Sequence, residues 1–586
     1  MYVNRWVTLS ASALLQCSAG VSYCFSIYSS QLKDALGYSQ AEIQGLASPL
    51  VALLVVGWLP GFVYDSLRSH KHVGPRVVLL IGLAEHVCGY LGLWLVASGR
   101  AVLPYWGMVG LTVMAFNGSN WIDTACIATN VHNFPGDRGS VVGVLKALVG
   151  MSASIFTTIY VAGFRPEALS FLLFSAVGPA VLGLLALPFL DAQTGSETVT
   201  EDGNCKGRRF GAAFCVVIML ALYQLGTSGL MGVQDGMPAG VRGALLGGLA
   251  ALLLPLLFLW PRSGGLLIQE SHKGCCDEEE AFQHPGEGQD HQGQVDGAVW
   301  VHISSSATAE KGAAGIQEPL LASCQDLQPS QGLERDCSRN AESATAPPAL
   351  TVRECCASLN FWLLFATFGT GTGLGLMFVN NLGQLVESLG GMPDGQDVLV
   401  SLFSIFSAAG RLACGSFPEF LWHRYNVPRT AFLVGVTGLT AGVCLISAAS
   451  SLQLLWLAAP LAGFAFGCHW SLMPPLASEL FGMRRFATLY CLLQFATTFG
   501  TYAFATRLAG GVYELHGRWH GDEGKQCYGA DCYRSTFIVG ACAEGAAMLL
   551  AIALYLRTRN LYARKQEVRR LPENEDAEHQ RRTLQQ

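Results

Sequence analysis

The chain has 586 residues, of which 51% are hydrophobic and 13% are charged, and its formal net charge is −6. Soluble domains carry about 25% charged residues, so this composition excludes an ordinary soluble protein. The sequence contains no Walker A loop, no G-x-S-x-G elbow, no zinc-ligand spacing and no basic surface interleaved with aromatic residues. ATP-driven transport, hydrolase chemistry, a metal site and nucleic-acid binding therefore lack support. We expect an all-α membrane protein that is not an enzyme and uses no cofactor.

Apolar runs of roughly 20 residues, the length that crosses a bilayer core, recur along the chain. They predict about fourteen transmembrane helices, with twelve as the alternative. The first run starts almost at Met1 without the features of a cleaved signal peptide, so we expect it to stay as a span. The predicted spans are residues 6–28, 42–64, 77–98, 103–130, 140–162, 168–190, 209–228, 242–260, 358–381, 397–417, 430–449, 453–476, 486–510 and 534–556.

Composition divides the chain into five parts. Between the apolar regions lies a segment rich in Glu, Gly, Gln, Ser and Ala, which we expect to be a disordered cytoplasmic loop. The expected parts are an N-terminal six-helix half (1–190), two additional helices (205–262), the loop (263–356), a C-terminal six-helix half (357–557) and a tail (558–586).

Lys and Arg concentrate in the connections on one side of the predicted membrane, including Arg424, Arg429 and the cluster after Arg557. The positive-inside rule therefore places both termini in the cytoplasm. The plasma membrane and a vacuolar or other organelle membrane both fit this pattern.

The two halves repeat one another. "GVSYCFSIYSSQLKDALG" from Gly20 aligns with "GLGLMFVNNLGQLVESLG" from Gly373, and "GSNW" aligns with "GCHW", which pairs Asn120 with His469. Two homologous halves in the same orientation are the plan of a parallel-repeat transporter whose substrate site lies between the halves. We therefore expect two pseudo-symmetric six-helix bundles plus two extra central helices.

The motif "GFVYDSLRSHKHVGPRVVL" after the second span resembles the signature of the major facilitator superfamily, and "GRLACG" (410–415) resembles its equivalent in the second half. "NFPGDRGSVVGVLKALVG", "FVNNLGQLVESLG", "SELFGMRRFATLY" and "CYGADCY" make the chain similar to the plant and algal nodulin-like branch of that superfamily. The resemblance implies a major facilitator fold and a conformational latch between helix ends. Its expected members are Gly61, Asp65, Arg68 and Arg76 in the first half and Glu479 with Arg484 in the second.

Span four carries a polar face, because Asn117, Asn120, Asp123 and Thr124 fall within about 120° of the helix surface. Polar groups in a membrane helix point inward, so this face is expected to line a cavity. The substrate-cavity candidates are Asn117, Asn120, Trp121, Asp123, Thr124, His469 and Trp470. An interhelical hydrogen-bond network without a ligand is the alternative.

Asp123 and His469 are the proton-coupling candidates because both side chains can titrate within the membrane. For Asp123 the alternative is a buried acid that is paired with a cation or held neutral. For His469 it is a histidine satisfied by a neighbouring helix.

Polar residues at the outer ends of spans one and nine are either an outer gate or helix caps: Tyr28, Gln31, Asn380, Asn381 and Gln384. In the last outer loop, Cys527 and Cys532 are expected to form a disulfide, with two free thiols as the alternative.

The function expected from these patterns is secondary active transport of a small polar or anionic organic solute by alternating access, with proton coupling as one variant. The alternative is a transporter-like receptor or scaffold that signals through the cytoplasmic loop. Expected partners are the solute, protons and the lipid bilayer, and we expect a monomer.

Overall fold

Nearly all of the described chain is helical. The computed structural model describes residues 4–38, 42–43, 46, 57–67, 73–192, 203–231, 238–259, 350–391, 393–519 and 525–570. Residues 263–349 of the predicted cytoplasmic loop, residues 44–45 and 47–56 of the predicted second span, and Arg68 lie outside the described residues. The last residues of the predicted loop, from 352, belong to a helix.

The N-terminal half comprises seven described α-helices with short 3-10 or π segments between some of them. They are α1 (Arg5–Ala19), η1 (Val21–Cys24), α2 (Phe25–Leu36), α5 (Leu59–Ser66), α6 (Gly74–Ala97), α7 (Tyr105–Asn133), α8 (Arg138–Ile159), η2 (Tyr160–Phe164), α9 (Ala168–Ala186) and η3 (Leu187–Phe189). Two further helices follow, α10 (Gly203–Met231) and α11 (Ala239–Leu253), the second continuing as η4 (Leu254–Leu259).

The C-terminal half has the corresponding helices and a small hairpin. Its elements are α13 (Val352–Ala357), α14 (Leu359–Asn380), α15 (Leu382–Ser388), α16 (Pro393–Tyr425), α17 (Arg429–Ala448), α18 (Leu452–Phe481), α19 (Phe486–Thr501), η5 (Tyr502–Ala509), α20 (Gly510–His516), β1 (Arg518–Trp519), β2 (Lys525–Gln526) and α21 (Asp531–Arg570). The two strands pair antiparallel, with Arg518 opposite Gln526.

Local sequence explains several helix boundaries. The Asn4 side chain accepts a hydrogen bond from the Trp6 N–H and so caps α1. Thr351 and Glu354 form a reciprocal capping box at the start of α13. Gly37 adopts a left-handed φ of 66° and ends α2.

The first predicted span is not one continuous helix, because α1 ends at Ala19 and a 3-10 segment separates it from α2. Gly20 lies against Ser152 of α8 so closely that a Cβ there would overlap the serine hydroxyl. The break therefore coincides with the close approach of two helices.

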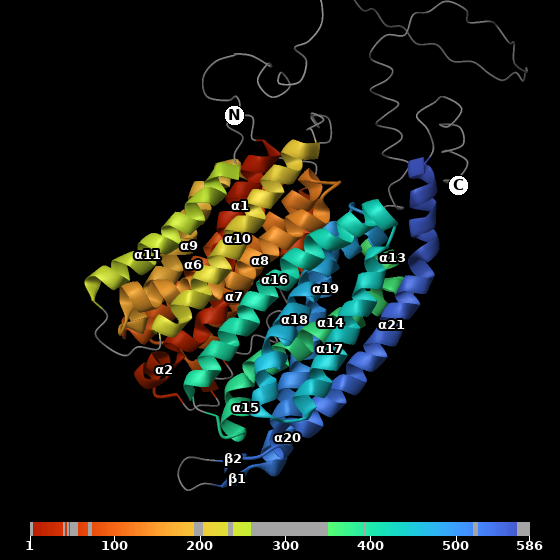
Figure 1. Ribbon diagram of the computed structural model, residues 1–586. Coiled ribbons are helices and arrows are strands. Elements are labelled where there is room, and N and C mark those ends of the chain that lie inside the picture. Colours follow the sequence, from red (N-terminus) through yellow and green to blue (C-terminus); the bar gives the residue numbers. More distant parts are fainter. Residues whose placement is uncertain are drawn as a thin grey trace, which may run out of the picture. The chain divides into compact units, whose positions relative to one another are not determined.

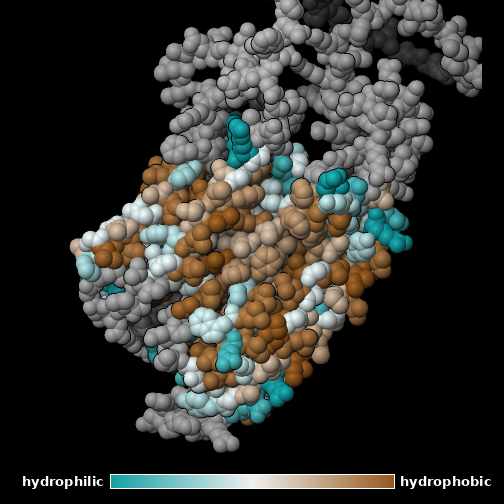
Figure 2. All heavy atoms as spheres, in the orientation of Figure 1, coloured by the Kyte–Doolittle hydropathy of each residue, from teal (hydrophilic) through white to brown (hydrophobic). Residues whose placement is uncertain are grey.

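Ten helices among the described residues are long and apolar enough to cross a membrane. Four predicted spans are outside this set: those at α1 and α5, whose helices have 15 and 8 residues, and those at α7 and α19, which carry polar side chains. Figure 2 shows hydrophobic residues over most of the visible face and hydrophilic residues gathered towards its ends. These features confirm a multi-pass, all-α membrane protein.

The two halves lie side by side (Figure 1). They contact one another through α8 with α16 and α18, and through α19 with α5 and α7, while α10 packs against both α8 and α16. The start of α1 and the end of α21 lie at one end of the helices, here termed the terminal end, and the β1–β2 hairpin lies at the opposite, hairpin end. The interface between the halves, here termed the seam, is therefore formed mainly by α5, α7, α8, α16, α18 and α19.

Candidate functional site

A buried ion pair lies at the seam, between α7 and α8. Lys146 Nζ is 2.9 Å from Asp123 Oδ1 and 2.8 Å from Oδ2. Asp123 is 7% exposed and Lys146 is 3% exposed. Asp123 is thus an acid paired with a cation, which was one of the alternatives raised by the sequence.

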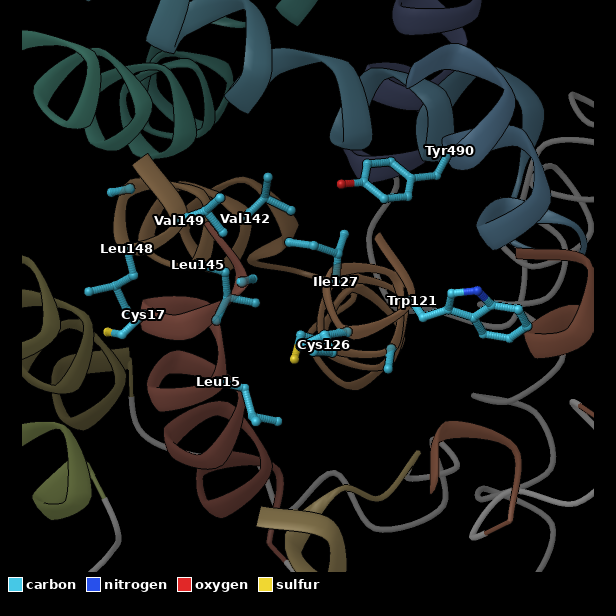
Figure 3. Packing of buried hydrophobic residues seen from close by; sticks show 14 of the residues in the cluster. Leu15, Cys17, Trp121, Cys126, Ile127, Val142, Leu145, Leu148, Val149 and Tyr490 are labelled. Atoms are coloured by element: carbon cyan, nitrogen blue, oxygen red, sulfur yellow. The ribbon is translucent and has the colours of Figure 1, made fainter. Parts of the chain in front are cut away.

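Two further side chains donate to the same carboxylate. Gln16 Nε2 of α1 lies 2.9 Å from Asp123 Oδ1, and the Tyr490 hydroxyl of α19 lies 2.6 Å from Oδ2. Figure 3 shows the Tyr490 hydroxyl directed from the C-terminal half towards α7 and α8. The carboxylate therefore connects helices of both halves, and each of its oxygens accepts two charge-assisted hydrogen bonds.

A second buried cation, Arg411 of α16, lies beside this pair. It is 3% exposed, and its Nη1 donates to the backbone carbonyl of Lys146. The guanidinium occupies the space left by Gly150 of α8, where a Cβ would overlap it. Lys146 Nζ also lies 5.1 Å from the ring centroid of Trp470 and 5.2 Å from that of Tyr490, so aromatic faces of the C-terminal half stabilise the ammonium group.

These groups border a cavity of about 130 Å³, here termed the central cavity. Its lining residues are Ala19, Ser22, Phe116, Ser119, Asn120, Asp123, Lys146, Val149, Arg411, Trp470 and Gln494. Pockets for drug-sized ligands measure roughly 300–1,000 Å³, so the central cavity suits a much smaller solute. Its ionised side chains are those of Lys146, Arg411 and Asp123.

Several polar atoms of the lining residues have no hydrogen-bond partner within the described residues. They include Ser119 Oγ, Asn120 Oδ1, Trp470 Nε1 and Gln494 Nε2. Buried polar groups are normally hydrogen-bonded, so each buried polar atom without a partner needs an explanation. A bound polar solute would supply the missing partners.

Of the seven cavity residues predicted from sequence, Asn120, Asp123 and Trp470 line the central cavity. The other residues of span four have partners elsewhere. Asn117 Nδ2 donates to Glu85 Oε2 of α6 at 2.7 Å, and the Thr124 hydroxyl lies 2.8 Å from the Asn120 carbonyl and 3.3 Å from Cys491 Sγ. Trp121 leaves α7 on the side away from α8 (Figure 3) and packs against Gly82 of α6.

His469 lies inside the C-terminal half instead of in the lining of the central cavity. It is 1% exposed, its Nε2 is 3.4 Å from Thr440 Oγ1 of α17, and its ring packs against Gly371 of α14. Because one residue is a rotation of about 100° on a helix, Trp470 faces the seam while His469 faces the interior of its own half.

At the terminal end, Asp65 joins the two halves. Its Oδ2 accepts hydrogen bonds from the Thr488 N–H at 2.8 Å and the Thr488 hydroxyl at 2.6 Å, in the first turn of α19. A negative charge at a helix N-terminus is stabilised by the helix dipole. Gly61 permits this contact, because a Cβ there would overlap the Ala487 carbonyl.

The other expected latch residues have different partners from those anticipated. Arg76 donates to the carbonyl oxygens of Leu190 and Pro188 at 3.1 Å, within its own half. Glu479 bonds to Arg429 and accepts from the Tyr562 hydroxyl at 2.7 Å, whereas Arg484 is exposed. The predicted pairing of Glu479 with Arg484 is therefore replaced by one with Arg429.

Arg429 Nη2 also lies 3.2 Å from Glu419 Oε1. The other oxygen of Glu419, Oε2, accepts hydrogen bonds from the N–H and the hydroxyl of Ser140 in the N-terminal half, at 3.3 and 3.2 Å. These residues border a second cavity of about 210 Å³, lined by Pro135, Gly136, Arg138, Glu419, Trp422, Arg429, Glu479 and Tyr562. The network joins the halves at the terminal end. Sequence reasoning had treated Arg429 only as part of the charge bias.

At the hairpin end, the expected gate residues bond within their own halves. Gln31 Nε2 donates to the Pro166 carbonyl at 2.9 Å, Asn381 Nδ2 to the Met377 carbonyl at 2.8 Å, and the Tyr533 hydroxyl to Gln384 Oε1 at 2.9 Å. Tyr28 is buried and Asn380 is exposed. In the same region Cys527 and Cys532 form a disulfide.

The fold and the seam-lying cavity define a membrane transporter of the major facilitator type. Over 93% of this chain and 94% of the other, the fold matches the structure of the major facilitator superfamily proton:xylose symporter XylE bound to 6-bromo-6-deoxy-D-glucose, with a TM-score of 0.50 and 10% sequence identity.

Residues 5–258 match the family described as Nodulin-like, and residues 349–564 match the family described as NFD4, C-terminal domain. The chain belongs to the nodulin-like family of the major facilitator superfamily.

Relatives with curated names agree with this assignment. The chain is 24% identical to Protein NUCLEAR FUSION DEFECTIVE 4 of Arabidopsis thaliana over 96% of this chain and 90% of that protein. It is 28% identical to the Oxalate:formate antiporter of Oxalobacter formigenes over 47% of this chain and 62% of that protein. It is 26% identical to the Probable transporter mch1 of Neurospora crassa over 44% and 50% of the respective chains.

Proposed function

We propose that this protein carries small organic anions across a membrane by alternating access of the central cavity. The observation that supports this most directly is the pair of buried cations, Lys146 and Arg411, beside a single carboxylate, Asp123. The cavity-lining residues include two cations and one carboxylate, and this balance favours a solute that brings negative charge.

In the proposed complex, a solute carboxylate binds between Lys146 and Arg411, and the Trp470 and Gln494 side chains donate the remaining hydrogen bonds. Asp123 then serves as the counter-ion of Lys146, because the ammonium group donates to both of its carboxylate oxygens. A fixed counter-ion keeps the ammonium group stable while the cavity is empty.

Similarity to a protein named for oxalate and formate exchange supports small carboxylates as the solute class. Both solutes are compact enough for a cavity of about 130 Å³. The likeness to the xylose symporter concerns the fold and says nothing of the solute.

The contacts at the terminal end form the proposed latch. Asp65 with Thr488, and Glu419 with Ser140, join the halves there and must separate when that end opens. We propose that the terminal end is cytoplasmic, as the distribution of Lys and Arg suggests. An epitope inserted in residues 263–356 should then bind antibody only after cells are permeabilised.

The solute class can be tested by thermal stabilisation of the purified full-length protein with oxalate, formate and xylose at matched ionic strength. Binding to the folded state raises the unfolding midpoint. We expect stabilisation by oxalate and formate, loss of that effect in Lys146→Met, and no effect of xylose. Stabilisation by xylose alone would contradict the proposal.

A further inference from the structure

A second acidic side chain lies deep in the C-terminal half, away from the central cavity. Glu544 of α21 is 0% exposed, and neither carboxylate oxygen has a hydrogen-bond partner within the described residues. Asp123, by contrast, has four bonds to its oxygens. The two intramembrane acids are therefore in opposite electrostatic situations.

The neighbours of Glu544 follow from the antiparallel packing of α17 against α21. A Cβ at Gly438 would lie 3.4 Å from Met548 Sδ, and one at Gly540 would lie 3.5 Å from Cys444 Sγ. Glu544 is midway between positions 540 and 548, so it is level with residues 440 and 441 of α17. It also shares a helix face with Gly540, one turn away.

His469 of α18 contacts α17 at Thr440, the same level along α17 as Glu544. The Thr440 hydroxyl donates to the Val436 carbonyl at 3.0 Å, so it accepts from the His469 Nε2–H at 3.4 Å. In the neutral ring this leaves Nδ1 as a base, and Nδ1 has no hydrogen-bond partner in the described part of the chain. A void of about 10 Å³, lined in part by Gly371, Thr440 and Cys444, lies in the same layer and approaches the size needed for one water.

Within the described residues, no cation acts on Glu544 from the helices packed around it. Residues 359–380 of α14 include no ionisable side chain, and α17 presents Cys444. Figure 1 shows α15 and α20, which carry Glu387, Tyr513, Glu514 and His516, near the hairpin end where α21 begins. The ionisable residues of η5, Tyr502 and Arg507, are exposed. An ionised Glu544 would be desolvated and unpaired, which proteins avoid by keeping such a group protonated.

We propose that Glu544 is a proton-binding site of the C-terminal half, occupied in this conformation. On release, the O–H bond of Glu544 breaks, the electron pair stays on the carboxylate, and the proton passes to water that enters this layer. The resulting carboxylate is stable only where a hydrated or cationic partner is present. Proton occupancy is therefore linked to a conformation that excludes water from this layer.

The site is placed to influence the central cavity. The ring of Trp470 lines that cavity. It packs edge-on against Phe368 of α14, with the ring centroids 5.3 Å apart. Because α21 packs against α14, a change of charge at Glu544 acts on the helix whose Phe368 contacts the cavity-lining ring of Trp470. This coupling step rests on the proposed transport of anions, whereas the proton site itself does not.

Infrared spectroscopy of the full-length protein in lipid tests the site directly, because protonated carboxyl groups have a C=O stretching band that carboxylates lack. At neutral pH we expect Glu544→Gln to remove part of this band. Glu544→Met, a second replacement without a titrating group, should remove the same part. The exposed control Glu387→Gln should leave it intact, and so should Asp123→Asn, which alters an ionised group. A band unchanged by both Glu544 replacements, or one that disappears when Na⁺ replaces choline, would overturn the proposal.

Coupling is tested separately with oxalate as the probe in proteoliposomes. Wild-type protein should accumulate oxalate in response to an imposed pH gradient, and Glu544→Gln should exchange oxalate but lose this accumulation. Undiminished pH-driven accumulation by Glu544→Gln would overturn the coupling step. Absence of oxalate exchange by wild-type protein would instead contradict the proposed function and leave the infrared result standing.

Discussion

The hydroxyl of Tyr490 lies 2.6 Å from Asp123 Oδ2 and so connects the two halves of the protein at the central cavity. Hydrogen bonds to charged groups contribute about 1.5–3 kcal/mol. Tyr490→Phe removes this bond but keeps the ring beside Lys146, whose Nζ lies 5.2 Å from the ring centroid. We expect the variant to favour other conformations, seen as faster backbone hydrogen exchange in α19. Exchange identical to that of wild-type protein would show that the bond does not hold the halves together.

The Asp123–Lys146 pair predicts an asymmetric response to substitution. Removing one partner of a buried pair costs about 3–5 kcal/mol because a charge is left unpaired, whereas removing both costs much less. Lys146→Met should therefore lower the thermal unfolding midpoint strongly, and Lys146→Met with Asp123→Asn should recover most of the loss. Additive destabilisation in the double variant would contradict the pairing.

The contact of Asp65 with Thr488 predicts that the terminal end loosens when the charge is removed. Asp65→Asn keeps an acceptor oxygen but loses a favourable charge at the α19 N-terminus, which is typically worth about 0.3–1 kcal/mol and up to roughly 2 kcal/mol when partly buried. We expect faster hydrogen exchange at residues 486–489. Thr488→Ser retains both donors and is the matched control, so equal changes in the two variants would refute this role.

The close approach of α8 and α16 depends on Gly415. A Cβ there would lie 2.6 Å from Gly143 Cα and 2.7 Å from the Gly139 carbonyl oxygen. Gly415→Ala should destabilise this conformation by about 1–3 kcal/mol through overpacking. Gly435→Ala, in α17 with open space around the position, should be neutral or stabilising. Thermal unfolding of the two variants in the same detergent gives the comparison.

Hydropathy and the internal repeat were sufficient to predict the fold class, and the motifs were sufficient to predict the family. The helical periodicity of span four also identified Asn120 and Asp123, because a polar face in a membrane helix must point inward. The break after Ala19 was missed, since it depends on how closely Gly20 approaches Ser152.

The partners of Asp123 could not be predicted, because they come from α1, α8 and α19 and meet only in the packed structure. Two signals were nevertheless present. Lys146 is a single cation within an apolar span. Arg411 belongs to "GRLACG", which resembles a loop signature but lies in the middle of α16. Intramembrane cations are functional candidates by default and would have pointed to the cavity.

Counterflow of labelled oxalate and of its neutral analogue oxamide into proteoliposomes tests the central claim most directly, because the two solutes are similar in size and shape and differ in charge. If Lys146 and Arg411 select an anion, the full-length protein will exchange oxalate and not oxamide, and Arg411→Gln will lose most of the oxalate exchange. Exchange of oxamide as fast as oxalate, or undiminished oxalate exchange by Arg411→Gln, would contradict the account.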